Sequence, residues 1–132
     1  IRRVCPNCAE DEPLGTHQLA RLGYEAREIQ GMTFKVGRGC NDCHFLGYKG
    51  RVAVFELLSL NDQVKDAVLA KKSSYEIRRL SIETSGLVTL LEDSIFKAMQ
   101  GLTSFDEIIR QVPRLGKPRQ INEIRRLLGE VQ

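Results

Sequence analysis

Two C-x-x-C pairs constrain the fold of this chain more than any other feature of its sequence. They are formed by Cys5 and Cys8 and by Cys40 and Cys43, the only cysteines in the 132 residues. Two residues between two thiols allow a tight turn to direct both sulfur atoms at one point, as a tetrahedral zinc ion requires. Two such turns facing each other supply four thiolates and leave no position for water, which is typical of structural zinc. The sequence therefore predicts one structural Zn²⁺ bound by these four cysteines.

The cysteines could also serve uses other than zinc binding. A disulfide framework is expected in secreted chains, and no basic segment followed by an apolar one marks the start of this sequence for export. A thioredoxin-like redox site needs one C-x-x-C at a helix start rather than two matched pairs. His17 and His44 are further candidate ligands, but four thiols already complete the site. Disulfide bonding, redox chemistry and unligated buried thiols are the alternatives.

The segment between the pairs is long enough to carry structure of its own. Simple zinc ribbons have about 15–20 residues there, whereas here the segment runs over residues 9–39. Its pattern predicts a helix from Thr16 to Leu22 and a short strand from Thr33 to Val36. Because its apolar residues are few, we expect zinc to hold this insertion in place. Residues 1–50 are thus expected to form a tetracysteine zinc lobe with a short strand or hairpin.

A strand is predicted directly after the lobe. The segment from Val52 to Leu58 is apolar on both alternating faces except for Glu56. Such a pattern is typical of an internal strand covered on two sides.

Helical signals follow this strand. Asn61 or Asp62 is expected to cap a first helix. Three capping boxes, in which a hydroxyl and a Glu three residues later satisfy each other's free N–H, predict three more helices. These boxes are Ser73 with Glu76, Thr89 with Glu92, and Ser104 with Glu107. We expect the helices to form a compact bundle against the strand, so that residues 51–112 make one domain.

The last part of the sequence is expected to be a linker and a helix. Pro113, Gly116 and Pro118 favour a linker, and Gln120 to Leu128 has the pattern of an amphipathic helix. The sequence does not decide whether this helix packs on its own domain or on another subunit. The predicted fold class is α+β: a small tetracysteine zinc lobe, a mainly α-helical bundle and, at residues 113–132, a linker with a C-terminal helix.

Charge, apolar run lengths and missing motifs argue against nucleic-acid binding, membrane insertion and catalysis. The chain has 20 Lys and Arg residues against 17 Asp and Glu, a formal net charge of +3, which is too balanced to indicate a nucleic-acid partner. Its apolar runs are too short to cross a bilayer, so we expect no membrane insertion. The sequence contains no phosphate loop, dinucleotide fingerprint, zinc-protease motif or nucleophile elbow. We therefore predict no active site in this chain and expect it to be part of a longer protein.

Six motifs follow one another along most of residues 2–112. They are Arg3-Val4-Cys5-Pro6-Asn7-Cys8, Cys40-Asn41-Asp42-Cys43-His44-Phe45-Leu46-Gly47-Tyr48-Lys49-Gly50-Arg51, Phe55-Glu56-Leu57-Leu58, Ile77-Arg78-Arg79-Leu80, Gly86-Leu87-Val88-Thr89-Leu90-Leu91-Glu92-Asp93 and Lys97-Ala98-Met99-Gln100-Gly101-Leu102-Thr103-Ser104-Phe105-Asp106-Glu107-Ile108-Ile109. This series resembles the C-terminal domain of a known family, the hexameric motor ATPases of type II secretion and type IV pilus assembly. The most specific part is the second cysteine pair leading into Gly-Tyr-Lys-Gly-Arg. The segment between the cysteine pairs and residues 113–132 lie outside the pattern.

The resemblance implies a RecA-like ATPase core whose phosphate loop and Walker B segment lie upstream, so that ATP binds outside this chain. It also implies a hexameric ring in the cytoplasm, with neighbouring ATPase subunits and an inner-membrane platform protein as partners. The strand from Val52 to Leu58 would belong to the core sheet. Arg51 and Glu56 match family positions, for which we expect subunit-interface or structural roles; simple surface ion pairing is the alternative.

The alternative function is a zinc-ribbon module that binds nucleic acid. Such a module would place aromatic and basic side chains together on the zinc lobe. The lobe has both, but its acidic residues nearly cancel the basic ones. The basic and aromatic residues are Arg21, Arg27, Lys35, Arg38, Tyr24 and Phe34, and the acidic ones are Glu10, Asp11, Glu12, Glu25 and Glu28. A redox enzyme that uses the thiol pairs is a third class, and it would require a cysteine of low pKa.

Overall fold

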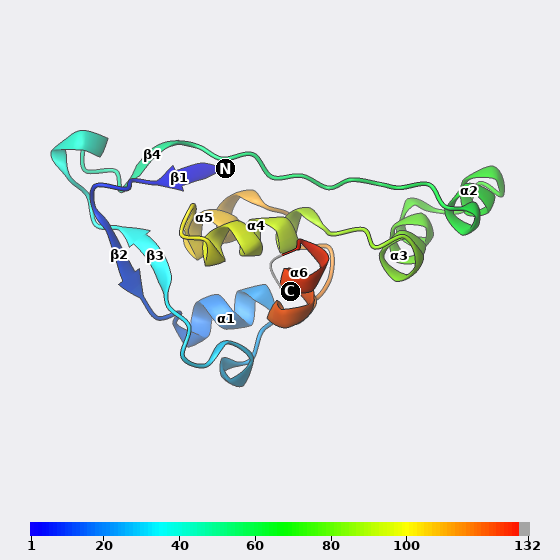
Figure 1. Ribbon diagram of the computed structural model, residues 1–132, viewed down its shortest axis with the longest axis horizontal. Coiled ribbons are helices and arrows are strands. Elements are labelled where there is room, and N and C mark those ends of the chain that lie inside the picture. Colours follow the sequence, from blue (N-terminus) through cyan, green and yellow to red (C-terminus); the bar gives the residue numbers. More distant parts are fainter. Residues whose placement is uncertain (130–132) are drawn as a thin grey trace.

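The computed structural model describes residues 1–129 and contains six α-helices, two 3₁₀ helices and two small antiparallel sheets within them (Figure 1). The α+β class with a small cysteine-bearing lobe is therefore confirmed. In chain order the elements are β1 (Arg2–Val4), β2 (Ala9–Glu12), α1 (Thr16–Leu22), η1 (Ala26–Ile29), β3 (Phe34–Gly37), η2 (Asn41–Cys43), β4 (Tyr48–Arg51), α2 (Asp62–Leu69), α3 (Ser74–Thr84), α4 (Leu90–Met99), α5 (Phe105–Gln111) and α6 (Ile121–Leu127).

Both sheets have two strands. β1 pairs with β4, and β2 pairs with β3 in a register that runs from Ala9 opposite Gly37 to Glu12 opposite Phe34. The helix predicted from Thr16 to Leu22 is confirmed, and the strand predicted at residues 33–36 lies one residue later. The sheets bring the two cysteine pairs to the same end of the molecule, because β1 and β2 flank the first pair and β3 and β4 flank the second.

The hydrophobic core joins the insertion between the cysteine pairs to the later helices. Leu22, Tyr24 and Phe34 are at most 4% exposed, and the ring of Phe34 lies edge-on to that of Phe105 with centroids 4.4 Å apart. The expectation that the insertion has too few apolar side chains to be held by packing was therefore wrong, since those side chains pack against residues far along the sequence. The cluster comprises Leu19, Leu22, Tyr24, Ile29, Phe34, Leu91, Ile95, Phe96, Ala98, Phe105, Ile108, Val112, Ile121 and Ile124.

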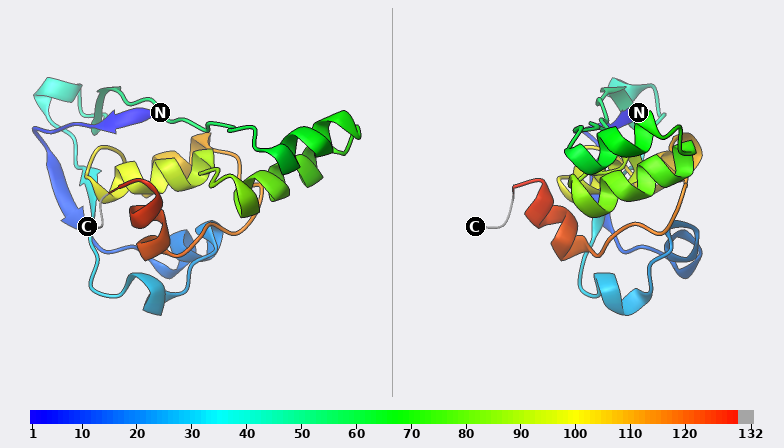
Figure 2. Two further views of the ribbon diagram at one scale, coloured as in Figure 1. Left: turned by 45° about the vertical axis from the view of Figure 1, so that its right-hand side comes forward. Right: turned by 90° about the vertical axis from the view of Figure 1, so that its right-hand side faces the viewer.

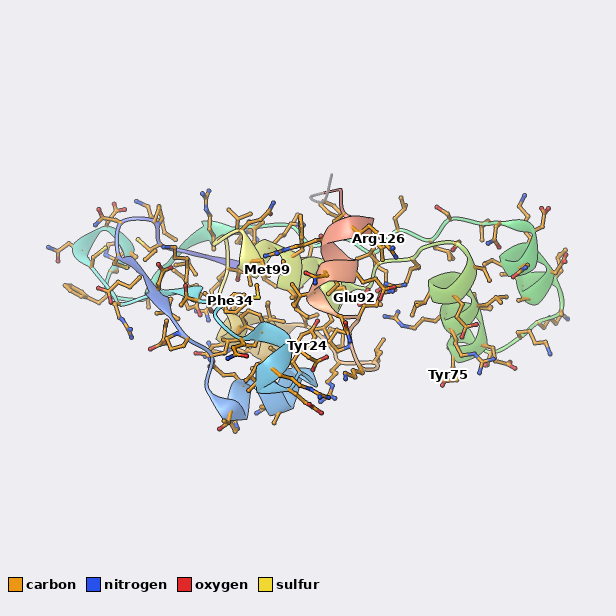
Figure 3. The ribbon with its side chains drawn as sticks, turned by 60° about the horizontal axis from the view of Figure 1, so that its bottom comes forward. Tyr24, Phe34, Tyr75, Glu92, Met99 and Arg126 are labelled. Atoms are coloured by element: carbon orange, nitrogen blue, oxygen red, sulfur yellow. The ribbon has the colours of Figure 1, made fainter. Side chains whose placement is uncertain are left out.

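Helices α2 and α3 pack on each other and project from this core on two extended connections, residues 52–61 and 85–89 (Figures 1 and 2). The only residues that the two helices bury are Val64 and Ser81. Figure 3 shows Tyr24, Phe34 and Glu92 in the body of the molecule and Tyr75 on the projecting pair, far from them. The expected single compact bundle is thus wrong. We call residues 62–84 the helical hairpin.

The strand predicted from Val52 to Leu58 is also wrong. The segment is extended, but within residues 1–129 it pairs with no strand beyond two bonds between Val52 and Ile1, from the Val52 N–H to the Ile1 carbonyl (2.9 Å) and from the Ile1 amino group to the Val52 carbonyl (3.1 Å). Phe55 and Leu57 are 68% and 78% exposed, while Val54 and Glu56, which alternate with them, are half-buried. An apolar run becomes a strand only where a neighbour supplies the ladder of hydrogen bonds, and here none of the described residues does so.

Helix caps follow the sequence closely, with one exception. The boxes of Ser73 with Glu76 and of Thr89 with Glu92 are both closed. Ser104 accepts a hydrogen bond from the Glu107 N–H at 3.2 Å, as a cap should. The Glu107 carboxylate does not complete that box, because it binds the Arg2 guanidinium instead, at 2.7 Å.

The C-terminal segment packs on its own domain. Ile121 and Ile124 of α6 are 4% and 0% exposed and belong to the core, and Arg119 pairs with the buried Glu92 at 2.7 Å. Residues 130–132 lie outside the described residues. The division into 1–50, 51–112 and 113–132 stays a prediction, although all three ranges contribute to one core. No helix within residues 1–129 has the length and apolar character needed to cross a bilayer.

Candidate metal centre

The four cysteine sulfur atoms converge at the end of the molecule where the two sheets meet. All four lie within 4.8 Å of one another. The Sγ atoms of Cys5 and Cys40 are 3.8 Å apart, those of Cys8 and Cys43 3.8 Å, and those of Cys40 and Cys43 3.7 Å. A tetrahedron with zinc–sulfur bonds of about 2.3 Å has edges of about 3.8 Å, whereas a disulfide requires about 2.05 Å. The thiols are free and spaced as a tetrahedral ion needs.

Close backbone approaches fix the two turns that carry these thiols. The Cys5 N–H donates to the Gly47 carbonyl at 3.0 Å, which ties the first turn to the segment after the second. A Cβ added to Gly37 would lie 1.9 Å from the Gly47 oxygen, so a side chain at Gly37 would force the chains apart. His44 and Phe45 adopt positive φ angles of 53° and 61° to complete the second turn. The sequence thus uses glycine where the two turns touch.

The backbone N–H groups of Asp42 and Cys43 donate to the Cys40 sulfur atom, and four further N–H groups donate to cluster sulfur atoms, each at 3.3 Å. Three are backbone groups: Gly39 donates to Cys8, and both Cys40 and Gly47 donate to Cys43. The fourth is the side-chain amide of Asn7, whose Nδ2 donates to Cys40. Such donors spread the negative charge of thiolates and orient them towards a metal.

The thiols differ in acidity. The amide of Asn7 is the largest influence on Cys40 and lowers its pKa to about 6. Burial raises the pKa of Cys43. The hydrogen bonds from the N–H groups of Cys40 and Gly47 lower it by more than burial raises it, so the pKa is lowered overall. Desolvation raises the pKa of Cys8 to about 11 despite the Gly39 N–H. A divalent cation stabilises all thiolates that coordinate it, so loading this cluster at neutral pH would release protons.

The histidines stand outside the cluster. The group of possible ligands found among residues 1–129 consists of the four cysteines alone. His44 follows Cys43 as the residue after η2 and is exposed, and His17 is exposed on α1. The residues predicted as zinc ligands therefore come together, and the histidines weighed as substitutes do not.

Glu56 and Arg51 lie in different surroundings. The half-buried Glu56 carboxylate accepts from Arg78 at 2.6 and 3.1 Å and from the Leu90 N–H at 2.9 Å. It thereby joins the extended segment to α3 and α4. Arg51 is exposed at the end of β4, opposite Arg2. Their expected roles at a subunit interface stay predictions.

Three polar features were missed at the level of sequence: the Asn7–Cys40 bond, the Arg2–Glu107 pair and the Arg119–Glu92 pair. The residues of the two ion pairs are separated by more than twenty positions along the chain, so no local pattern indicates them. Asn7 does carry a weak signal, because it lies inside a C-x-x-C turn and has a donor within reach of a sulfur atom.

Ion pairs balance the charge of the cysteine-bearing lobe. Arg38 pairs with Glu10 and Glu12 at 2.8 and 3.2 Å, and Lys35 pairs with Asp11 at 2.9 Å. Lys49 pairs with Asp42 at 2.7 Å, directly beside the cluster. These basic side chains are therefore engaged with acidic ones on the same surface.

Comparisons with known proteins agree on one family. Residues 1–110, which include all four cysteines, match the family described as "Type II/IV secretion system protein". The chain is 40% identical over 109 residues to the type IV pilus assembly ATPase PilB of Thermus thermophilus, covering 83% of this chain and 12% of that protein. It is 31% identical over 110 residues to the type II secretion system protein E of Klebsiella pneumoniae, covering 83% and 21%. It is also 31% identical over 109 residues to PilB of Myxococcus xanthus, covering 82% and 19%. The chain thus spans only a small part of the length of these relatives.

Proposed function

Because the chain belongs to the family of type II/IV secretion system proteins, we propose that it is the zinc-binding C-terminal domain of a secretion or pilus-assembly motor ATPase. Its role is structural and mechanical. The ATP-binding motifs belong to a RecA-like core upstream of this chain, and nucleotide hydrolysis takes place there. The chain transmits the movement of that core and offers a surface to other components.

One observation carries this proposal: four thiols with the spacing of a tetrahedral ion lie within the family-matched residues. Zinc and four thiolates leave no open coordination position, so the ion supplies cohesion and no reaction. Cys5 and Cys8 hold the turn between β1 and β2, and Cys40 and Cys43 hold the turn at η2. The metal would lock these two turns together and make this end of the molecule rigid.

The surface of the helical hairpin and its connections supports a role in assembly. Phe55, Leu57, Leu69 and Tyr75 are all more than 65% exposed, which is unusual for large apolar side chains gathered on one part of a protein. In our proposal this part contacts neighbouring subunits of a hexameric ring. The cytoplasmic face of an inner-membrane platform protein is the other partner. Glu56 has a structural role in fixing the hairpin, and Arg51 is free to contact a neighbouring subunit.

Metal analysis of the purified chain tests the structural part. We expect one zinc per chain by mass spectrometry under native conditions. Chelation should disorder η2 and the sheet of β1 and β4, which hydrogen exchange would detect. The helices should persist in circular dichroism, because the core packs without the metal. Cys5→Ser combined with Cys43→Ser should reproduce the chelated state. A metal-free chain with oxidised or freely alkylated thiols would overturn the zinc assignment.

A genetic experiment tests the functional part. In the organism that encodes the chain, Cys40→Ser with Cys43→Ser in the full-length gene should lower protein secretion or pilus assembly. His17→Ala, which changes an exposed residue outside the cluster, is the matched control and should have no effect. Normal secretion and piliation in a strain producing the cysteine variant at wild-type level would contradict the proposal.

Nucleic-acid binding is disfavoured by the ion pairs of the lobe. Arg38, Lys35 and Lys49 each bind a carboxylate on the same surface, so few free cations face solvent to release counterions from phosphates. We expect no salt-dependent binding of the zinc-loaded chain to DNA or RNA in fluorescence anisotropy. A steep decrease of affinity with salt would favour the nucleic-acid module instead. Thiols that react with iodoacetamide only after chelation would exclude the redox enzyme.

A further inference from the structure

Asn7 differs from the other groups that donate to the cysteine cluster. The other N–H donors within residues 1–129, those of Gly39, Cys40, Asp42, Cys43 and Gly47, are backbone groups, which the fold itself fixes. Asn7 reaches Cys40 with a side chain, at 3.3 Å from Nδ2 to Sγ. It is thus the donor that a point substitution can remove without moving the backbone.

This bond also connects the two cysteine pairs. Asn7 belongs to the first pair, between Cys5 and Cys8, whereas the sulfur atom that it contacts belongs to the second. The backbone donors all belong to the second half of the site, at residues 39–47, and of these the Gly39 N–H also reaches across to the first pair, at Cys8. Asn7 can donate to Cys40 only when the two turns face each other, which is also the condition for four-ligand binding.

The Asn7 side chain makes no other interaction that would explain its position. Asn7 is exposed, takes no part in the core, and its amide has no second hydrogen bond within the described residues. The second pair offers a natural comparison in Asn41, which is also exposed and also lies between two ligands. Asn41 contributes its backbone carbonyl to the turn, accepting from the His44 N–H at 3.3 Å, and its amide contacts no cluster sulfur.

We propose that Asn7 is a positioning residue for the metal, which holds the Cys40 thiolate in place for coordination and slows its release. The proposal rests on zinc binding by the four cysteines. A tetrathiolate zinc site has two more negative than positive charges, so a neutral donor directed at one thiolate stabilises the loaded state more than the empty one. Donors of this kind typically change metal affinity by about 10–100-fold.

Metal competition with three variants tests this inference. Asn7→Ala removes the donor, Asn7→Asp places a carboxylate at nearly the same position, and Asn41→Ala is the control that keeps the backbone acceptor. Zinc affinity is measured by competition with a chromophoric chelator, and metal release by a stopped-flow chase. Cobalt absorption in the visible reports the thiolate coordination of each variant.

We expect Asn7→Ala to weaken zinc binding by about 10-fold and to speed its release. Asn7→Asp should weaken binding further, because its charge repels the Cys40 thiolate. Asn41→Ala should bind like the wild type, and all variants should keep the wild-type circular dichroism since both asparagines are exposed.

The outcomes separate this inference from the function on which it rests. If the wild type binds zinc and Asn7→Ala binds it as tightly and releases it as slowly, the positioning role is wrong while the zinc site stands. If Asn41→Ala weakens binding as much as Asn7→Ala, the effect belongs to the turns in general and the assignment to Asn7 fails. A wild type that binds neither zinc nor cobalt overturns the metal centre itself.

Discussion

The core and the helical hairpin begin with the same sequence signals and end in opposite surroundings. The box of Thr89 with Glu92 starts α4, and the box of Ser73 with Glu76 starts α3; both are closed. α4 buries seven of its ten residues, whereas α3 buries only Ser81 among eleven. Caps therefore determine where a helix begins, and they carry no information about what it packs against.

The difference originates in the apolar stripes of the two helices. Ile95 and Ala98 of α4 belong to the core, where α4 packs against α5, α6 and β3, and their exposures are 0% and 1%. Ile77 and Leu80 of α3 are only half-buried, and Leu69 and Tyr75 at the far end of the hairpin are 80% and 67% exposed. Two helices alone cannot cover each other's apolar surface, so the hairpin is expected to be the less stable part of the molecule.

Large-to-small substitutions should give the largest contrast between the two regions. Phe105→Ala in the core should lower the free energy of unfolding by about 3–5 kcal/mol, because it leaves a cavity beside Phe34. Leu69→Ala in the hairpin should change it by less than about 0.5 kcal/mol. Urea denaturation followed by circular dichroism measures both. Equal losses would mean that the hairpin packs as part of the core in solution.

The buried ion pair at the C-terminal segment should give the next largest effect. Arg119→Ala leaves Glu92, whose side chain is 3% exposed, without its cation and should cost about 3 kcal/mol. Arg79→Ala is the matched control on the hairpin, since its pair with Glu83 is 3.8 Å long and more than half exposed; it should cost about 0–0.5 kcal/mol. Thermal unfolding of the two variants measures the stability that each one loses. A neutral Arg119→Ala would show that the Arg119–Glu92 pair adds nothing to the stability of the core.

Glu56→Gln tests how the hairpin is attached. Weakening the bonds to Arg78 and to the Leu90 N–H should lower global stability by only about 1–2 kcal/mol. Its main effect should be local, with faster hydrogen exchange in α2 and α3 than in α4. Glu83→Gln, on the exposed face of α3, is the control and should leave exchange unchanged. Equal acceleration in α4 would contradict a separate attachment of the hairpin.

The smallest effect should be the dependence on pH that comes from the Arg2–Glu107 pair. Burial raises the pKa of the Glu107 carboxyl, but the hydrogen bonds and charge of Arg2 outweigh it, so the pKa is lowered overall. A carboxyl whose pKa is lower in the folded state stabilises the fold above its unfolded pKa of about 4.3, and loses this contribution as the pH falls through the folded pKa.

Glu107→Gln should therefore lower the melting temperature by about 2–4 °C at neutral pH. The two proteins should converge in acid, where the wild-type carboxyl is also uncharged. Melting curves recorded from neutral to strongly acidic pH provide the measurement. A difference that stays constant over this range would exclude the Arg2–Glu107 pair as its source.

Local features of this molecule could be predicted from its sequence. The helix starts at Asn61, Ser73, Thr89 and Ser104 follow from side chains that bond to backbone only three residues away. The convergence of the four cysteines follows equally from their spacing, because each turn is a local structure.

Features that depend on distant partners could not be predicted. The apolar run from Val52 to Leu58 looks like a strand, but a strand exists only with a neighbour, which the run itself does not specify. The packing of the insertion on the core is a second such feature, because the contact of Phe34 with Phe105 joins positions 71 apart in the sequence. No local sequence pattern indicates the Arg119–Glu92 pair, because the two residues are far apart in the sequence.

The bond from the Leu90 N–H to Glu56 closes a ring in the chain. Between these two residues the chain runs out through α2 and back through α3, and its return is also held to the body by Arg119, which donates to the Ile82 and Leu87 carbonyls. For a flexible loop of this kind, doubling the length costs only about 0.6 kcal/mol of closure entropy. A change in the length of this segment would therefore cost the remaining architecture little and would alter how far α2 and α3 reach from the body.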